Sequence, residues 1–86
     1  MPRICEFYGI SIYIDYADHA PPHFHAMYSG QEAVIAMREP RILGGSLPQR
    51  AARLVRLWAD KNRDGLLENW DRARGGLPLQ AMEPLE

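Results

Sequence analysis

The sequence has a single cysteine, Cys5, and no excess of positive charge. One cysteine cannot form a disulfide within the chain, which fits a reducing compartment. The formal net charge is −1, so the bulk charge gives no sign of a nucleic-acid-binding protein. No apolar run approaches the roughly 18 residues that a membrane-spanning helix needs. We therefore expect a cytoplasmic protein with no membrane contact and no signal peptide.

The chain is also short, at 86 residues. This length predicts one α+β domain, residues 1–86, with room for one sheet and one or two helices. It leaves no room for a large enclosed substrate cavity. Any ligand site is therefore expected to be a surface groove or a cleft shared between subunits.

The first half of the sequence has the alternation of β-strands. In residues 10–16, isoleucine and tyrosine alternate with more polar residues, the period-2 pattern of a strand with one buried face. Further strands are expected at residues 4–7, 23–28, 31–37 and 41–43. Tyr8-Gly9 and Ser29-Gly30 fit the turns between successive strands.

The second half predicts two helices and an extended C-terminal tail that docks. Gly44-Gly45 breaks the sheet pattern, and Ser46 with Gln49 has the spacing of a capping box. An apolar helical stripe follows, made of Leu47, Ala51, Leu54, Val55 and Trp58. Asp64 would cap the second helix, which ends at Gly75-Gly76. The order predicts an α+β fold: a small antiparallel sheet of four to five strands, then two helices packed on one face.

All three histidines lie in residues 18–25, Asp-His-Ala-Pro-Pro-His-Phe-His. The two prolines cannot lie inside a central strand, so the strand is expected to begin at His23. Residues two apart on a strand point to the same side, with Cα atoms roughly 6.6 Å apart. Phe24 is assigned to the core, which places His23 and His25 on the opposite, wetter face.

One interpretation of this pair is a divalent-metal site. Zinc takes four ligands, or three and a water, so His23 and His25 alone are too few. Asp18 and Glu32 are the acidic residues best placed to complete the set, whereas His19 lies beyond the two prolines. Because the histidine pair is incomplete, we expect no metal and no cofactor.

A second interpretation is a metal-independent ribonuclease with His23 or His25 as the catalytic acid or base, because imidazole exchanges protons near neutral pH. The phosphate, or an acidic partner, would be held by arginines of the first helix, Arg50, Arg53 and Arg56. However, helices packed on the Phe24 face would lie across the sheet from the histidines. The residues leave open whether the protein is an enzyme.

Two further interpretations need no chemistry. In a structural one, Asp18 closes an Asx turn, His19 bonds a backbone carbonyl, and the strand histidines are simply outward polar residues. In the other, the outward face binds a protein partner through a mixed aromatic and apolar patch. The residues expected in that binding surface are Asp18, His19, His23, His25, Met27, Val34 and Tyr13. Trp58 and Trp70 complete helical stripes, and they are expected in the core with Cys5 as a small buried residue.

The whole sequence resembles the bacterial family catalogued as domain of unknown function 4160. The matching stretches are Met1-Pro2-Arg3-Ile4, Phe7-Tyr8-Gly9-Ile10, Asp18 to His25, Tyr28-Ser29-Gly30, Leu47-Pro48, Arg53-Leu54-Val55 with Trp58, Leu66 to Trp70, and Gly76 to Leu79. Members are typically small and often encoded beside another short protein, an arrangement like a toxin–antitoxin pair. The resemblance thus implies a cognate protein partner.

The family motif covers Asp18, His19, His23 and His25, which implies a shared role for them. This sequence has Asn62 where the family often has His, so a fourth histidine ligand is absent, and Gly65 where the family often has Glu. We expect a non-enzymatic, partner-binding component of a two-gene, toxin–antitoxin-like module. A second copy of the chain, bound in a homodimer through an exposed sheet edge, is an alternative partner, and nucleic acid is a further alternative.

Overall fold

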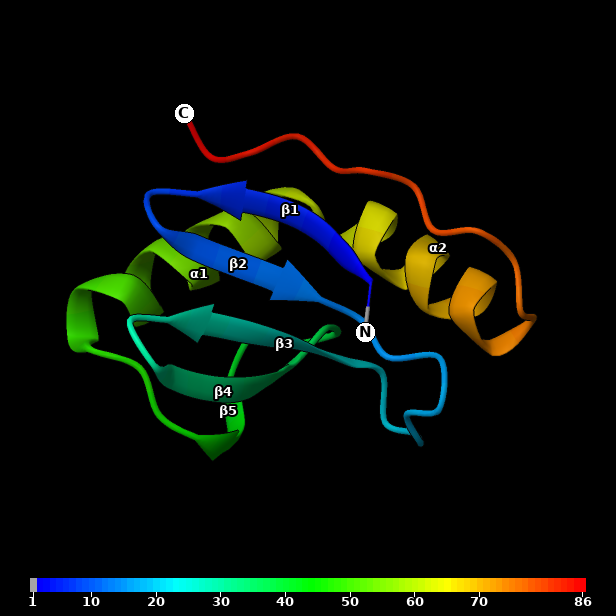
Figure 1. Cartoon of the computed structure of the whole chain (residues 1–86), viewed down its shortest axis with the longest axis horizontal. Helices are drawn as coiled ribbons and strands as arrows, with labels where there is room; N and C mark the ends of the chain where they lie inside the picture. The colour runs from blue at the N-terminus through cyan, green and yellow to red at the C-terminus, as the bar shows by residue number, and fades with distance from the viewer. Residues whose placement is uncertain (1) are drawn as a thin grey trace.

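The computed structural model describes residues 2–86 as a five-stranded antiparallel sheet followed by two helices (Figure 1). The strands are β1 (Arg3–Phe7), β2 (Ile10–Tyr13), β3 (His23–Tyr28), β4 (Gln31–Ala36) and β5 (Ile42–Gly45), and the helices are α1 (Gln49–Lys61) and α2 (Arg63–Arg74). Neighbouring strands in the sheet are neighbours in the chain. The predicted α+β fold is confirmed.

Two tight turns set the register of the first four strands. Tyr8 and Gly9 have φ of 49° and 79°, and Ser29 and Gly30 have φ of 49° and 83°. Positive φ at both central residues is the requirement of a type I′ hairpin turn, whose twist matches that of the strands. Both predicted turns are confirmed. The resulting register places His25 of β3 between Tyr13 of β2 and Val34 of β4.

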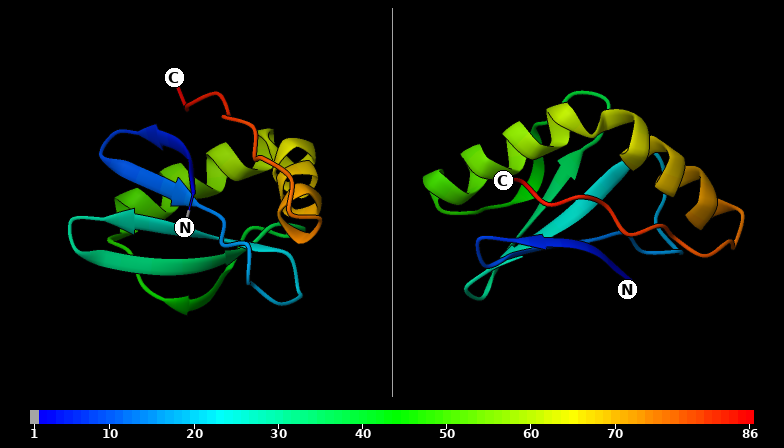
Figure 2. Two further views of the ribbon diagram at one scale, coloured as in Figure 1. Left: turned by 45° about the vertical axis from the view of Figure 1, so that its right-hand side comes forward. Right: turned by 90° about the horizontal axis from the view of Figure 1, so that it is seen from above.

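The core lies between the sheet and α1, which covers one sheet face (Figure 2). Phe24 is fully buried, as predicted, and its ring centroid lies 5.9 Å from that of Trp58. Trp58 also packs against Phe7, with ring centroids 5.5 Å apart. The predicted inward face of residues 10–16 is confirmed at Ile10, Ile12 and Ile14.

The second strand is shorter than predicted. It ends at Tyr13, and Tyr16 is 42% exposed instead of lying in the core. The Tyr16 hydroxyl donates a hydrogen bond to the Leu77 carbonyl, 2.9 Å away. The side chain thus points toward the C-terminal tail because the chain turns away from the sheet after Ile14.

The start of α1 differs from the capping-box prediction. β5 continues through Gly44-Gly45, and the Ser46 N–H donates to the Glu32 carbonyl at 3.1 Å. Ser46 therefore extends the sheet pairing. α1 begins after Pro48, and no side chain of the described residues caps it.

The junction of the two helices also differs, because α2 begins directly after Asn62. The Asn62 side-chain amide donates to the Trp58 carbonyl at 2.8 Å and so completes the end of α1. Asp64 lies in the first turn of α2, and within residues 2–86 no side chain caps that helix. The predicted capping role of Asp64 is therefore wrong. Neither of the two described helices has the length and apolar character that crossing a membrane requires.

The C-terminal tail, residues 75–86, runs along α2 and β1 (Figure 1). Its backbone is held by the Met82 N–H on the Ile4 carbonyl and by the Trp58 indole N–H on the Glu83 carbonyl, each at 2.8 Å. The predicted docking residues Leu79, Met82 and Leu85 pack against the core. Cys5 is buried under the tail, as expected, and this burial raises the pKa of its thiol above the ordinary value of 9.0.

Asn69 is buried in α2 and fixes the tail through both ends of its amide. Its nitrogen donates to the Gln80 carbonyl at 2.9 Å, and its oxygen accepts the Gln80 N–H at 2.8 Å. We expect Asn69→Ala to lower the free energy of unfolding by about 1–3 kcal/mol, since it removes both hydrogen bonds between the buried Asn69 amide and the Gln80 backbone. Gln80→Ala keeps both backbone groups and is the control, with an expected effect within about 0.5 kcal/mol. Denaturant unfolding measures both, and equal losses would contradict the assignment.

Gly45 is the second position with a sharp stability prediction. Its φ is +70°, and a Cβ there would overlap the Glu32 carbonyl oxygen, whereas a Cβ at Gly44 would meet open space. We expect Gly45→Ala to cost at least about 1–3 kcal/mol of unfolding free energy, since it strains the backbone and crowds β4. Gly44→Ala is the neighbouring control and should be close to neutral. Thermal unfolding of the two variants measures the difference. A Gly45→Ala protein as stable as the wild type would refute the prediction.

Candidate functional site

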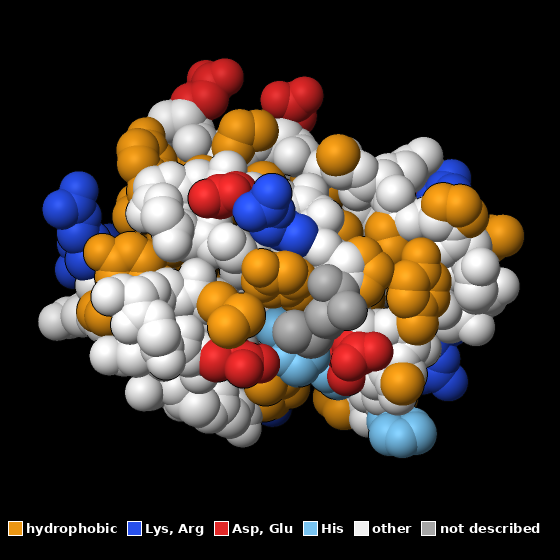
Figure 3. Space-filling view, viewed as in Figure 1, with side chains coloured by type: hydrophobic (Ala, Val, Ile, Leu, Met, Phe, Trp, Pro, Cys, Tyr) orange, Lys and Arg blue, Asp and Glu red, His pale blue; other side chains and the backbone are white. Residues whose placement is uncertain are grey.

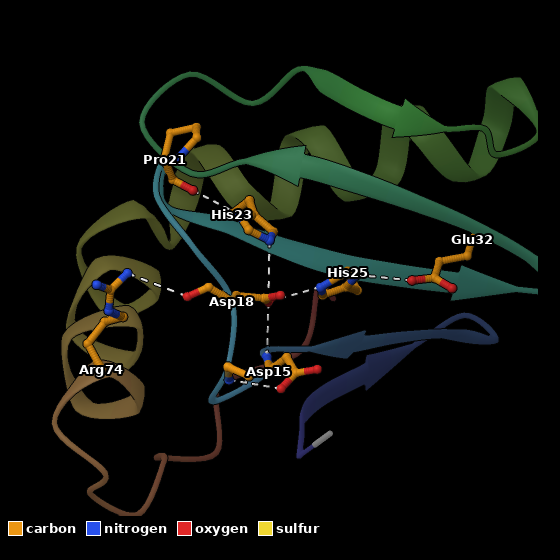
Figure 4. Close-up of polar contacts among 8 residues, drawn as sticks. Asp15, Asp18, Pro21, His23, His25, Glu32 and Arg74 are labelled. Atoms are coloured by element: carbon orange, nitrogen blue, oxygen red, sulfur yellow. Dashed lines mark hydrogen bonds and ion pairs between the residues drawn. The ribbon is translucent and has the colours of Figure 1, made fainter.

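One carboxylate oxygen of Asp18 is the meeting point of two histidines (Figure 4). Asp18 Oδ2 lies 3.0 Å from His25 Nε2 and 3.3 Å from His23 Nε2. Both imidazoles leave β3 on the same side, and their ring centroids are 5.4 Å apart. The two imidazoles thus converge on one acidic side chain, an arrangement that the sequence left open.

A tight turn after β2 brings Asp18 to this place. The Asp15 carboxylate accepts the Ala17 N–H at 3.0 Å, and the Asp18 N–H donates to the Asp15 carbonyl at 3.2 Å. The Asp15 N–H in turn lies 3.3 Å from Asp18 Oδ2. The Asx-type bond is thus made by Asp15, three residues before the predicted position. This turn directs the Asp18 carboxylate toward β3, while Oδ2 also accepts the Asp15 N–H.

The outer nitrogens of both rings are also held. His23 Nδ1 lies 2.8 Å from the Pro21 carbonyl oxygen, and His25 Nδ1 lies 3.0 Å from Glu32 Oε2. A carbonyl oxygen can only accept, so His23 Nδ1 carries a proton and its Nε2 faces Asp18. Glu32 thus lies on the outer side of His25. In the metal-site interpretation of the sequence, it is a possible ligand together with Asp18, His23 and His25.

The cluster is more enclosed than the predicted wet strand face. The side chains of His23, His25 and Asp18 are 13%, 14% and 17% exposed. The loop that carries Asp18 folds over the imidazoles, so they are not simply outward polar residues on an open strand. Such enclosure raises the cost of any lone pair or charge left without a partner.

The second helix contributes to the enclosure, which the sequence did not predict. α2 lies beyond the end of the sheet where β3 begins, whereas α1 covers the Phe24 face (Figures 1 and 2). The Trp70 ring centroid is 5.3 Å from that of His23. Arg74 Nη1 donates to the Asp18 carbonyl at 3.4 Å, and its guanidinium carbon lies 5.7 Å from the Trp70 ring centroid. Trp70 is buried, as predicted, but it also borders the site.

The other predicted site residues divide into two groups. Tyr13 and Met27 lie on the same outward face as His25, and Met27 is 37% exposed. His19 is exposed, and within residues 2–86 the set of potential metal ligands contains Asp18, His23 and His25 but not His19. Histidine side chains are visible between two acidic groups on this face (Figure 3).

The arginines do not join the histidines. All three are exposed on α1, which covers the opposite face of the sheet: Arg50, Arg53 and Arg56. The ribonuclease interpretation needs phosphate-binding side chains beside the imidazoles. The arrangement therefore removes the reason for combining these arginines and histidines in one site.

Sequence reasoning missed three contributors to the site. The Pro21 carbonyl, Trp70 and Arg74 come from a loop backbone and from α2. The nearness of Pro21 in sequence to His23 was a usable signal. Nothing in the helical stripe of α2 indicated which end of the sheet it would approach.

The family model described as domain of unknown function (DUF4160) matches residues 9–71, more than half of the chain. The chain belongs to the DUF4160 family. The family predicted from the sequence is confirmed over residues 9–71, and this matched part of the DUF4160 domain includes Asp18, His23, His25 and Glu32. Comparisons with curated proteins and with solved structures gave no significant match.

The contact between His23 and the Pro21 carbonyl makes a direct prediction for the metal-free protein. In long-range ¹H–¹⁵N spectra, His23 should have a protonated Nδ1, because that carbonyl can only accept a hydrogen bond. The exposed His19 provides the internal comparison and should show tautomers in exchange. A His23 ring protonated at Nε2 alone would contradict the geometry.

Proposed function

We propose that this DUF4160 domain is a non-enzymatic, partner-binding component of a two-gene, toxin–antitoxin-like module. Its partner is the small protein encoded by the neighbouring gene, and both act in the bacterial cytoplasm. The support for a partner is the resemblance to the DUF4160 family, whose model matches residues 9–71 and so includes the segment Asp18 to His25. The support for the contact surface comes from the sheet.

The observation that carries the proposal is the uncovered sheet face. α1 packs on the Phe24 face, and no helix of the described chain covers the face that carries Tyr13, Met27 and Val34 (Figure 2). Tyr13, His25 and Val34 lie side by side in register across three strands. This face therefore offers a contiguous, mixed aromatic and apolar surface.

The edge of this surface has the features of an interface rim. Leu43 is 42% exposed and, with Ala36 and Pro22, lines a shallow hollow of about 220 Å³. At the other edge of the sheet, Arg3 and Glu6 form an exposed ion pair. Protein interfaces place aromatic residues and methionine at the centre and charges at the rim. The proposed partner thus covers the apolar strip formed by Tyr13, Met27 and Val34, and it meets charged side chains around that strip.

Two further contacts belong to the same proposal as alternatives. Arg50, Arg53 and Arg56 present an exposed basic strip on α1 that suits an acidic partner segment. The free side of β5 could pair with a second copy, although this strand has only four residues and two of them are glycine. The open sheet face is preferred because it carries Tyr13, Met27 and Val34, whereas the strip on α1 is basic and β5 is short.

Met27 provides the test of the contact surface. We expect Met27→Glu to weaken binding of the neighbouring gene product by at least about tenfold, since it buries an unpaired charge in the apolar strip. Leu57→Glu is the matched control, because Leu57 is 50% exposed but lies on α1. Co-purification followed by calorimetry measures both. The proposal fails if the wild-type complex does not form, or if the two variants weaken it equally.

A further inference from the structure

We propose that Asp18, His23 and His25 bind one divalent transition-metal ion of the zinc class. The ligand atoms are Asp18 Oδ2, His23 Nε2 and His25 Nε2, which all lie within 4.8 Å of one another. The inference goes beyond partner binding and rests on this cluster alone. From the sequence alone, these residues are candidate metal ligands and no metal is expected. The geometry of the three ligand atoms is the reason to propose a bound ion.

The spacing of the ligand atoms fits a shared ion. The carboxylate oxygen lies 3.0 Å and 3.3 Å from the two imidazole nitrogens. Two ligands bound to zinc at about 2.0–2.1 Å with tetrahedral angles lie about 3.3–3.4 Å apart. Two of the three ligand separations thus match this geometry, and the two Nε2 atoms, which lie within 4.8 Å of each other, complete the set as the side chains rotate toward one ion.

The outer hydrogen bonds prepare both imidazoles as ligands. Metal-bound histidines almost always donate their other ring N–H to a carboxylate or a backbone carbonyl, which fixes the tautomer and the ring orientation. His23 Nδ1 meets the Pro21 carbonyl oxygen, and His25 Nδ1 meets the Glu32 carboxylate. Each ring is therefore held with Nε2 directed inward. His23 is held by a backbone carbonyl and His25 by a carboxylate.

The cluster also has more acceptors than neutral imidazoles can satisfy. With a proton on Nδ1, a neutral His23 directs the lone pair of Nε2 at a carboxylate oxygen 3.3 Å away. His25 faces a carboxylate oxygen at each nitrogen, while a neutral ring carries one proton. A cation between Oδ2 and both Nε2 atoms converts these opposed lone pairs into metal bonds. Two imidazolium rings are the competing solution, and the experiment distinguishes them.

The donor types select the ion. Two imidazoles and one carboxylate suit zinc, iron, cobalt or nickel, whereas magnesium and calcium take oxygen ligands almost exclusively. Three protein ligands leave at least one coordination position for water. The second helix limits access on one side, because Trp70 packs against His23.

The test is a Co²⁺ titration of tag-free, chelator-treated full-length protein, followed by visible absorption and by competition with Zn²⁺. We expect one ion per chain, with affinity lowered at least about 100-fold in His23→Ala, His25→Ala and Asp18→Asn. Glu32→Gln should weaken binding about 10–100-fold, since it replaces the charged hydrogen-bond acceptor behind His25 with a neutral amide. His19→Ala is the matched control, because His19 lies in the same segment outside the cluster, and it should bind as the wild type does.

A wild-type measurement guards against variants that do not fold. Zn²⁺ should shift the Nε2 resonances of His23 and His25, leave His19 unchanged, and raise the melting temperature by preferential binding to the folded state. Nε2 atoms that keep their protons in excess Zn²⁺ would establish the imidazolium alternative and overturn the proposal. So would the absence of saturable binding, or binding that survives both histidine variants. Either failure leaves the Met27 contact test unaffected.

Discussion

The contact of the Asp18 carboxylate with β3 ties together parts of the chain that share no sheet pairing. Through Oδ2 the loop after β2 is joined to His23 and His25, and through the Asp18 carbonyl it is joined to Arg74 of α2. The loop thus connects the sheet with the second helix, which packs Trp70 against His23. An enclosed polar cluster of this kind stabilises the fold only if every member has a partner, so its proton or metal content matters to the whole structure.

The remaining elements divide the sheet into a covered and an uncovered side. α1 supplies Trp58 to the core, and the same indole binds the Glu83 carbonyl, so one side chain orders both the core and the tail. Asn69 likewise joins α2 to the tail, through its two hydrogen bonds with the Gln80 backbone. Because α1 covers the Phe24 face, α2 lies beyond the end of the sheet and the tail runs along β1, no helix of the described chain covers the other face. The cluster of Asp18, His23 and His25 lies at one end of that face, and Tyr13, Met27 and Val34 lie beside it.

Much of the fold was predictable because it depends on local patterns. The isoleucines of residues 10–14, Phe24 and the stripe of α1 fell on the predicted faces, since strand and helix periodicity decides which side chains can share a surface. The errors at Ser46 and Tyr16 have a common cause. Each residue had a plausible local role, but a tertiary contact with Glu32 or Leu77 determined the outcome. The error at Asp64 is different, since α2 begins directly after Asn62 and Asp64 therefore lies inside its first turn.

By itself, the sequence determined that His23 and His25 share one side of a strand, because residues two apart in an extended chain must do so. It also determined that acidic residues were available nearby. Only the tertiary structure decided that Asp18 meets both Nε2 atoms while Glu32 stands behind His25, and that Trp70 closes one side. These contacts depend on how the loop after β2 folds back over β3 and on where α2 packs against the sheet. Such long-range contacts are not encoded in the periodicity of the sequence.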